Sequence, residues 1–149
     1  MSTRPLRLIG QDKSDVAPVS AALQDAIARM GDLKFEARAR RFTAVFSRYR
    51  WEKTSGKPER VRTGLQVGSV KAVKAMRLRK GAPDAFVSLL SLTFEPSGQA
   101  EDPSGVLVLT FAGGGALKLD VECVDLVLAD VSEPWRAAAR PDHQAGEAS

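Results

Sequence analysis

A hairpin-like pattern between Val106 and Cys123 sets the strongest limit on the fold. Large apolar residues alternate with small or polar ones on both sides of three glycines, and a period of two indicates strands. A slip of one residue would move every side chain to the other face. A three-residue loop, Gly113 to Gly115, keeps the large apolar groups together and ends on a glycine where φ must be positive. The expected pairs are Ala112–Ala116, Phe111–Leu117, Leu109–Leu119 and Leu107–Val121 on the apolar face, and Thr110–Lys118 and Val108–Asp120 on the other.

An amphipathic helix is expected near the N-terminus. Apolar residues recur there at intervals of three and four, the spacing of one helix face. They are Val16, Val19, Leu23, Ala26 and Ile27. Asp12, Ser14 and Asp15 are candidates to cap its start, and the helix is expected to end near Met30 and Gly31.

The other segments follow a period of two and predict strands joined mostly by short turns. The expected strands cover residues 6–9, 32–36, 41–52, 60–80 in two pieces that break near Gly68 and Ser69, 85–95, the two hairpin arms and 124–131. Residues 70–80 also fit a helical spacing, and we favour a strand. Strands do not alternate with helices, which argues against a parallel sheet.

We therefore expect an α+β fold in a single domain. Its core would be a strongly bent antiparallel sheet or partial barrel of about seven strands, with the N-terminal amphipathic helix closing an open end or face. A pleckstrin-homology-like topology is one candidate, although the helix normally comes last in that fold. The domain is expected to span residues 1–136, and residues 137–149 are expected to be a disordered tail because they offer little to bury.

Few residues are suited to catalysis or metal binding, so we predict no enzyme activity, cofactor or metal. The triple glycine lacks the Lys and Ser or Thr of a phosphate-binding loop. The single cysteine, Cys123, is expected to be an inert core residue, and the single histidine, His143, falls in the tail. An enzyme with carboxylate chemistry on the hairpin 106–123 is the third hypothesis for function, and it requires Asp120 and Glu122 to line a concave pocket.

Cysteine usage and the N-terminal sequence bear on location. One cysteine excludes an internal disulfide, and the first ten residues show no signal-peptide pattern, so we expect a cytoplasmic protein. The longest apolar runs are strand-sized and interrupted by charge, so no membrane span is expected.

Positive charge is concentrated in the middle of the chain. Residues 34–80 hold 15 lysines and arginines but three acids, whereas the remainder holds seven bases and 15 acids. Such asymmetry can mark a surface for an anionic partner. The candidate binding residues are Arg41, Arg48, Tyr49, Arg50, Trp51, Lys71, Lys74, Arg77, Arg79 and Lys80. An alternative interpretation is an ordinary sheet face whose arginines pair with the acidic C-terminal strands of the same molecule.

Two binding functions follow from this composition. The leading hypothesis is a non-catalytic binding or adaptor domain that docks an unidentified protein partner through a basic, aromatic-containing sheet face. The alternative is RNA binding through the basic segment 38–80, with cations along the backbone and aromatic rings stacked on bases. The oligomeric state is left open.

The chain resembles a family of small alphaproteobacterial proteins known only as a domain of unknown function. The segments that carry the resemblance are LRLIGQD, LQDAIARMGDL, RRFTAVFSRYRWE, RVRTGLQVGSVKAV, FAGGGALKLDVECVDLVLAD and RPDH, from about Leu6 to His143. The resemblance implies a bacterial, cytoplasmic, single-domain protein. It implies no reaction, ligand or catalytic residue.

Overall fold

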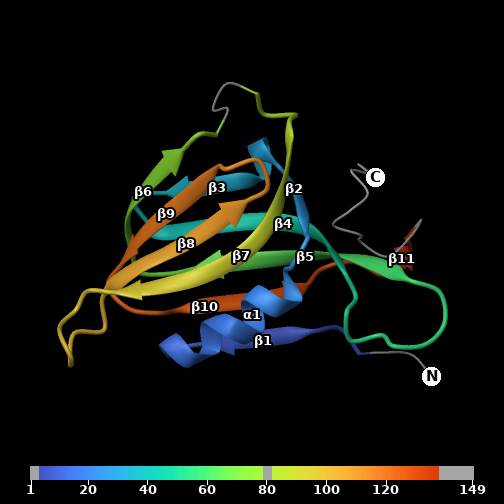
Figure 1. Cartoon of the computed structure of the whole chain (residues 1–149), viewed down its shortest axis with the longest axis horizontal. Helices are drawn as coiled ribbons and strands as arrows, with labels where there is room; N and C mark the ends of the chain where they lie inside the picture. Colours follow the sequence, from blue (N-terminus) through green and yellow to red (C-terminus); the bar gives the residue numbers. More distant parts are fainter. Residues whose placement is uncertain (1–3, 79–81, 138–149) are drawn as a thin grey trace.

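The computed structural model describes residues 4–78 and 82–137 as an antiparallel sheet with one short α-helix (Figure 1). This confirms the expected antiparallel sheet with little helix in a single domain. The described residues form 11 strands instead of about seven, and the pleckstrin-homology-like topology stays a prediction. The elements are β1 (Arg7–Gly10), a 3₁₀ turn (Lys13–Asp15), α1 (Val16–Ala22), β2 (Ile27–Arg29), a second 3₁₀ turn (Met30–Asp32), β3 (Leu33–Glu36), β4 (Arg41–Tyr49), β5 (Glu59–Val67), β6 (Val70–Met76), β7 (Phe86–Pro96), β8 (Gly105–Phe111), β9 (Ala116–Val121), β10 (Leu126–Asp130) and β11 (Trp135–Arg136).

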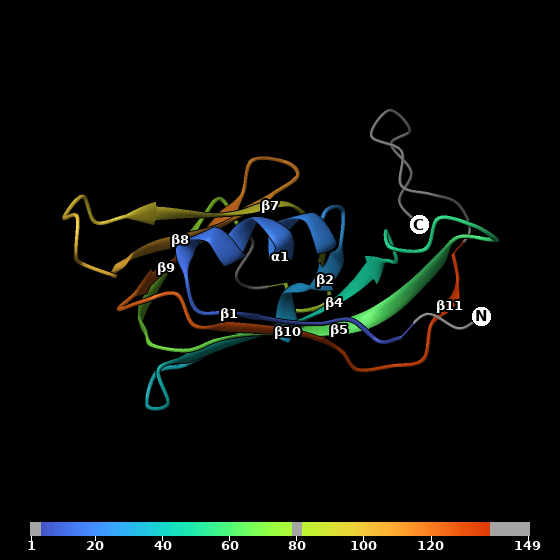
Figure 2. The same ribbon diagram turned by 90° about the horizontal axis from the view of Figure 1, so that it is seen from below.

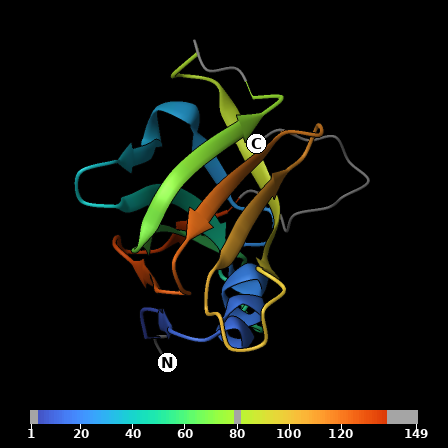
Figure 3. The ribbon, with the colours of Figure 1, turned by 90° about the vertical axis from the view of Figure 1, so that its left-hand side faces the viewer.

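The strands lie in two layers (Figure 2). The strand order is β1-β10-β5-β4-β2-β7-β8-β9-β6, with β3 added to β4 and β11 to β5. We call β1, β10, β5 and β4 the first layer, and β7, β8, β9 and β6 the second layer. The short strand β2 pairs with both β4 and β7 and joins the layers. Helix α1 lies along the open side between β1 and β7, so the sheet forms a partial barrel (Figures 1 and 3).

A single apolar core fills the space between the layers. Its large members come from both layers and include Phe42, Phe46, Leu65, Leu89, Leu107, Phe111, Leu119 and Leu128. Helix α1 contributes Val16 and Val19 to this core. No helix among the described residues is long and apolar enough to cross a membrane.

The helix is shorter than its sequence pattern predicts. Asp12, one of the expected caps, caps the preceding 3₁₀ turn instead of the helix and accepts a hydrogen bond from the backbone N–H of Ser14 at 3.1 Å. The N-cap of the helix itself, Asp15, makes no side-chain capping hydrogen bond. The helix ends at Ala22, and the chain then turns at Asp25, whose φ is 63°. The Asp25 N–H donates to the carbonyl of Leu89 on β7 at 2.8 Å. Pairing with β7 therefore replaces the last helical turns, and Ile27 enters β2 instead.

The hairpin has the predicted faces but a different register. Leu109 lies opposite Leu117 and Leu107 opposite Leu119, a shift of two residues from the expected pairs. On the other face Val108 lies opposite Lys118. Since a shift of two keeps every side chain on its own face, the large apolar groups still point into the core.

The position of the loop explains this shift. The Phe111 N–H donates to the carbonyl of Gly115 at 2.9 Å, so the three-residue loop comprises residues 112–114. The positive φ angles fall at Gly113 and Gly114, 92° and 96°. Gly115 instead packs against the chain after β6, where a Cβ would lie 2.5 Å from Cδ2 of Leu78. The third glycine is therefore required for packing and not for the turn.

Three other expectations from the sequence have different outcomes. The strand over residues 70–80 is confirmed as far as Met76, after the predicted break at Gly68 and Ser69. Cys123 is half-buried instead of lying in the core, because β9 ends before it. The expected tail lies outside the described residues from 138 onward, but its first residue, Ala137, is buried and donates a backbone hydrogen bond to Pro58 at 2.9 Å.

Candidate functional site

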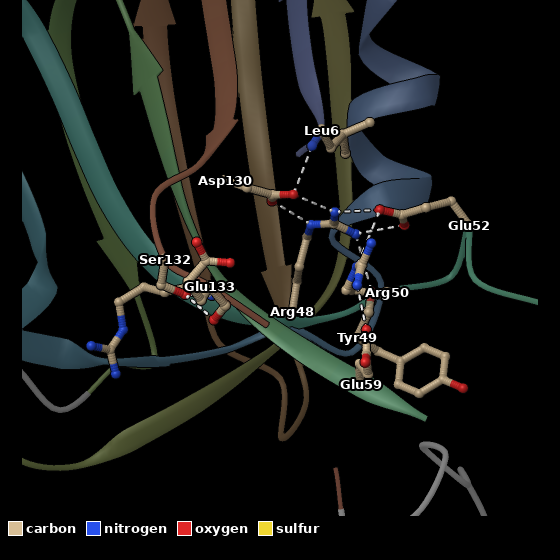
Figure 4. Close-up of polar contacts among 10 residues, drawn as sticks. Leu6, Arg48, Tyr49, Arg50, Glu52, Glu59, Asp130, Ser132 and Glu133 are labelled. Atoms are coloured by element: carbon tan, nitrogen blue, oxygen red, sulfur yellow. Dashed lines mark hydrogen bonds and ion pairs between the residues drawn. The ribbon is translucent and has the colours of Figure 1, made fainter. Parts of the chain in front are cut away.

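Arg48, a predicted surface residue, lies in the interior. Its side chain is 0% exposed, and all five of its N–H donors are used (Figure 4). Two bonds of 2.9 Å reach Asp130, and bonds of 2.9 and 2.7 Å reach Glu52. The fifth, of 3.2 Å, reaches the carbonyl of Tyr49. Because no donor is left over, Arg48 has none to offer to a partner.

The charges of this cluster stabilise one another. Burial alone would raise the pKa of Asp130, but hydrogen bonds from Arg48 and from the Leu6 N–H, together with the Arg48 charge, lower it below its ordinary value. The pKa of Glu52 is lowered in the same way. Burial opposes the charge of Arg48, but the two carboxylates outweigh it and raise the pKa of the guanidinium. All three groups are therefore ionised at neutral pH.

The neighbouring residues extend this internal network. The side chain of Arg50 is 5% exposed and forms an ion pair with Glu59, which also accepts from Lys53 at 3.1 Å. Tyr49 is buried, and its ring meets that of Trp51 edge-on with centroids 4.6 Å apart. The indole N–H of Trp51 donates to the carbonyl of Gln24 at 3.2 Å.

The prediction that Arg48, Tyr49 and Arg50 form an exposed basic face is therefore wrong. The cause is that β4 places Arg48 on the same side as Phe42 and Phe46, which face the core. The partners Glu52, Glu59 and Asp130 converge on these arginines inside the molecule. Asp130 on β10 is a partner of the kind that the alternative interpretation expected, whereas Glu52 and Glu59 belong to the basic stretch itself, and the arginines are buried.

The remaining predicted residues are distributed over two surfaces. Arg41 lies on the first layer and pairs with Glu36 at 3.1 Å. Lys71 pairs loosely with Asp120 at 3.8 Å, and Lys74 lies directly opposite Lys118, both on the second layer. Arg77 is exposed just beyond β6. Arg79 and Lys80 lie outside the described residues. The two basic segments are not neighbouring strands, because β6 pairs with β9 and β4 pairs with β5.

A surface that sequence reasoning missed lies on the solvent side of the first layer, which we call the outer face. Directly opposite residues form rows across the four strands, and the row Leu8, Leu128, Leu65 and Ala44 points inward. Because side chains alternate, the adjacent rows point outward. They are Arg7, Ala129, Gly64 and Val45; Ile9, Val127, Gln66 and Thr43; and Arg62, Ser47 and Ile27.

Exposed apolar side chains gather on the outer face and at its margins. Of seven large apolar side chains that are exposed among the described residues, five lie here: Ile9, Val45, Phe86, Val131 and Trp135. Val131 is 62% exposed, and its N–H donates to the backbone carbonyl of Arg62 at 2.8 Å, which continues the pairing of β10 with β5. Trp135 lies opposite Arg60 at the end of β5. Apolar side chains grouped in this way mark interaction surfaces more often than scattered ones do.

The outer face is also basic. Arg7 and Arg62 are exposed on it, and Lys34 is exposed beside it on β3, opposite Thr43. These three cations form no ion pair with another described residue. Two acids lie at its margins: Glu36 is paired with Arg41, whereas Glu133, between Val131 and Trp135, forms no ion pair with another described residue. A partner that covers this face would still meet a net positive charge, from Arg7, Lys34 and Arg62 against Glu133.

A groove of about 540 Å³ crosses β2 at the margin of the outer face. Ile27 and Ser47 are opposite each other in the pairing of β2 with β4 and line it. Val45 and Arg62 border it from the first layer, and Phe86, which is 68% exposed, borders it from β7. The groove can accept an apolar side chain beside the Phe86 ring and Val45, and the ion pair between Arg29 and Asp32 also lines it.

The carboxylates of the hairpin do not form the concave site that the enzyme hypothesis requires. The side chains of Asp120 and Glu122 are 52% and 50% exposed, and each is paired with a cation, Lys71 or Arg40. Within residues 4–78 and 82–137, no three potential metal ligands come together.

Comparison with known proteins places the chain in a family. No curated protein and no solved structure matches it. A family model described as "Protein of unknown function (DUF2948)" matches residues 6–143, nearly the whole of the 149-residue chain. The extent of this match confirms the resemblance noted from the sequence. The chain therefore belongs to the DUF2948 family of proteins of unknown function.

Proposed function

We propose that this protein is a non-catalytic, cytoplasmic docking domain of a bacterium that binds an acidic protein partner through the outer face. The observation that carries the proposal is the grouping of Ile9, Val45, Phe86, Val131 and Trp135 with unpaired cations on one side of the molecule. Exposed aromatic, aliphatic and arginine side chains are what protein interfaces favour.

The size of the outer face suits a modest interface. Four strands about 4.8 Å apart and three outward rows about 7 Å apart give a flat area of roughly 20 by 20 Å. This is smaller than the roughly 800 Å² that each partner buries in a standard specific complex. Such a face suits a transient complex, in which charge complementarity speeds association.

Site-specific photo-crosslinking in the host cells tests the proposal. A photoreactive amino acid replaces Ile9 on the outer face or, as the matched control, the exposed Thr93 on the second layer. The Ile9 variant should give an adduct with one protein, identified by mass spectrometry, whose crosslinked segment is rich in Asp and Glu. Equal adducts from both positions, none from Ile9, or an adduct between two copies of this chain would contradict the proposal.

RNA binding has less support from the same geometry. Lys74 lies directly opposite Lys118, and like charges in that position repel each other unless an anion lies between them. The outward residues around this pair include Val108, Thr110 and Met76, and no described aromatic side chain stands among them to stack on bases. A nuclease-sensitive adduct in the crosslinking experiment would favour RNA over a protein partner.

A further inference from the structure

A glycine lies in the middle of the outer face, and neither its backbone conformation nor its packing requires glycine there. Gly64 lies within β5, between β10 and β4, opposite Ala129 and Val45. Its φ is not in the left-handed region, so other residues can adopt its backbone conformation. A Cβ built there would meet only Cγ1 of Val131 at 3.9 Å and the carbonyl oxygen of Ala129 at 4.0 Å, which is ordinary van der Waals contact.

Other strand glycines of the molecule differ in this respect. At Gly105 a Cβ would lie 2.4 Å from the carbonyl oxygen of Glu95, and at Gly10 it would lie 2.7 Å from Leu126. These positions need glycine for packing, whereas Gly64 does not. Glycine inside a strand weakens it and often marks a site where another backbone approaches closely.

The residues around Gly64 define the surface that a partner would meet there. Ala129 lies beside it in the same row, so two of the smallest side chains adjoin at the centre of the first layer. Val131, Val45 and Arg62 stand around them on the same face. Side-chain bulk is therefore low at this point of the outer face, where a Cβ would still have room.

Resting on the proposed docking function, we propose that a segment of the acidic partner passes over Gly64 in extended conformation, with its main chain against Gly64 and Ala129. Arg62 is placed to donate to carbonyl or carboxylate oxygens of the segment, since a guanidinium carries five N–H donors. An apolar side chain of the same segment enters the groove over β2, between Val45 and Phe86. The recognised element is thus a short, extended, acidic stretch with one apolar anchor.

Substitution of Gly64 separates this role from a structural one. Gly64→Val should raise the melting temperature by about 2–5 °C, because a β-branched residue suits a strand and glycine does not. The same variant should lower the yield of the adduct from a photoreactive residue at position 9 at least tenfold, because the added side chain would occupy the space that the segment needs over Gly64. Gly64→Ala should show both effects in the same direction and to a smaller extent.

Ala72→Val is the matched control, because Ala72 is exposed on β6 in the second layer. It should leave the adduct yield unchanged. An unchanged yield in Gly64→Val, with a normal yield in the parent protein, overturns the extended-segment proposal and leaves the docking function intact. No adduct in the parent protein overturns both. A lower melting temperature in both Gly64 variants would show that the fold itself requires the glycine, and this result also overturns the proposal.

Discussion

Arg48 acts as an internal tie between segments that are distant in the sequence. Its guanidinium joins β4 to Asp130 on β10 and to Glu52 in the loop after β4. Asp130 also accepts a hydrogen bond from the backbone N–H of Leu6. Removing one partner of a buried ion pair leaves an uncompensated charge, which costs far more than the pair itself contributes. Arg48 therefore cannot be reversed in charge to test docking without disturbing the fold.

Asp130→Asn tests this tie at the level of a single residue. The side chain of Asp130 is 3% exposed, so the free energy of unfolding should fall by about 3–5 kcal/mol in urea denaturation at pH 7. Asp120→Asn is the control, because that side chain is 52% exposed, and it should change stability by less than about 1 kcal/mol. Equal effects of the two substitutions would contradict a structural role for the buried pair.

Asp130→Asn should also change how the stability of the protein depends on pH in acid. The pKa of Asp130 is lowered from its ordinary value of 3.8, so its contribution to stability is present above about pH 3.8 and is lost as the pH falls through the lowered folded-state pKa. Unfolding of the parent protein should therefore depend more steeply on pH below about 4 than unfolding of Asp130→Asn. The measurement is a series of urea titrations between about pH 2.5 and 7.

At the scale of single elements, the hairpin shows how packing selects among loops that the local pattern allows. Three consecutive glycines permit a three-residue loop at either of two positions, and both keep the apolar groups on one face. The close approach of Gly115 to Leu78 selects residues 112–114. This contact joins β9 to the end of β6 and could not be read from the hairpin alone.

Gly115→Ala tests that explanation. Its Cβ would lie 2.5 Å from Leu78 and 3.1 Å from the carbonyl oxygen of Arg77, so the strands must separate or the loop must move. We expect a loss of about 1–3 kcal/mol in the free energy of unfolding. Gly64→Ala, where a Cβ has room, should be slightly stabilising in the same assay. A neutral Gly115→Ala would show that the register has another cause.

Across the whole molecule, features set by local sequence were predictable and those set by cross-strand pairing were not. Alternation located most strands and the hairpin faces, and the period of two in β4 already placed Arg48 on the side of Phe42 and Phe46. Counting charged residues along the sequence, without asking which face of the strand each one occupies, suggested an exposed basic strand. The outer face combines β1, β10, β5 and β4, which lie far apart in the chain, so no local pattern revealed it.

The most direct test of this account compares the two basic surfaces of the molecule. Arg7→Glu with Arg62→Glu reverses the charge of the outer face, and Lys74→Glu with Lys118→Glu reverses that of the second layer. Affinity for the partner identified by crosslinking from position 9 should fall at least tenfold in the first double variant, with a weaker dependence on salt, and change less than about twofold in the second. An equal loss in both, or a loss confined to the Lys74 and Lys118 variant, would contradict docking through the outer face.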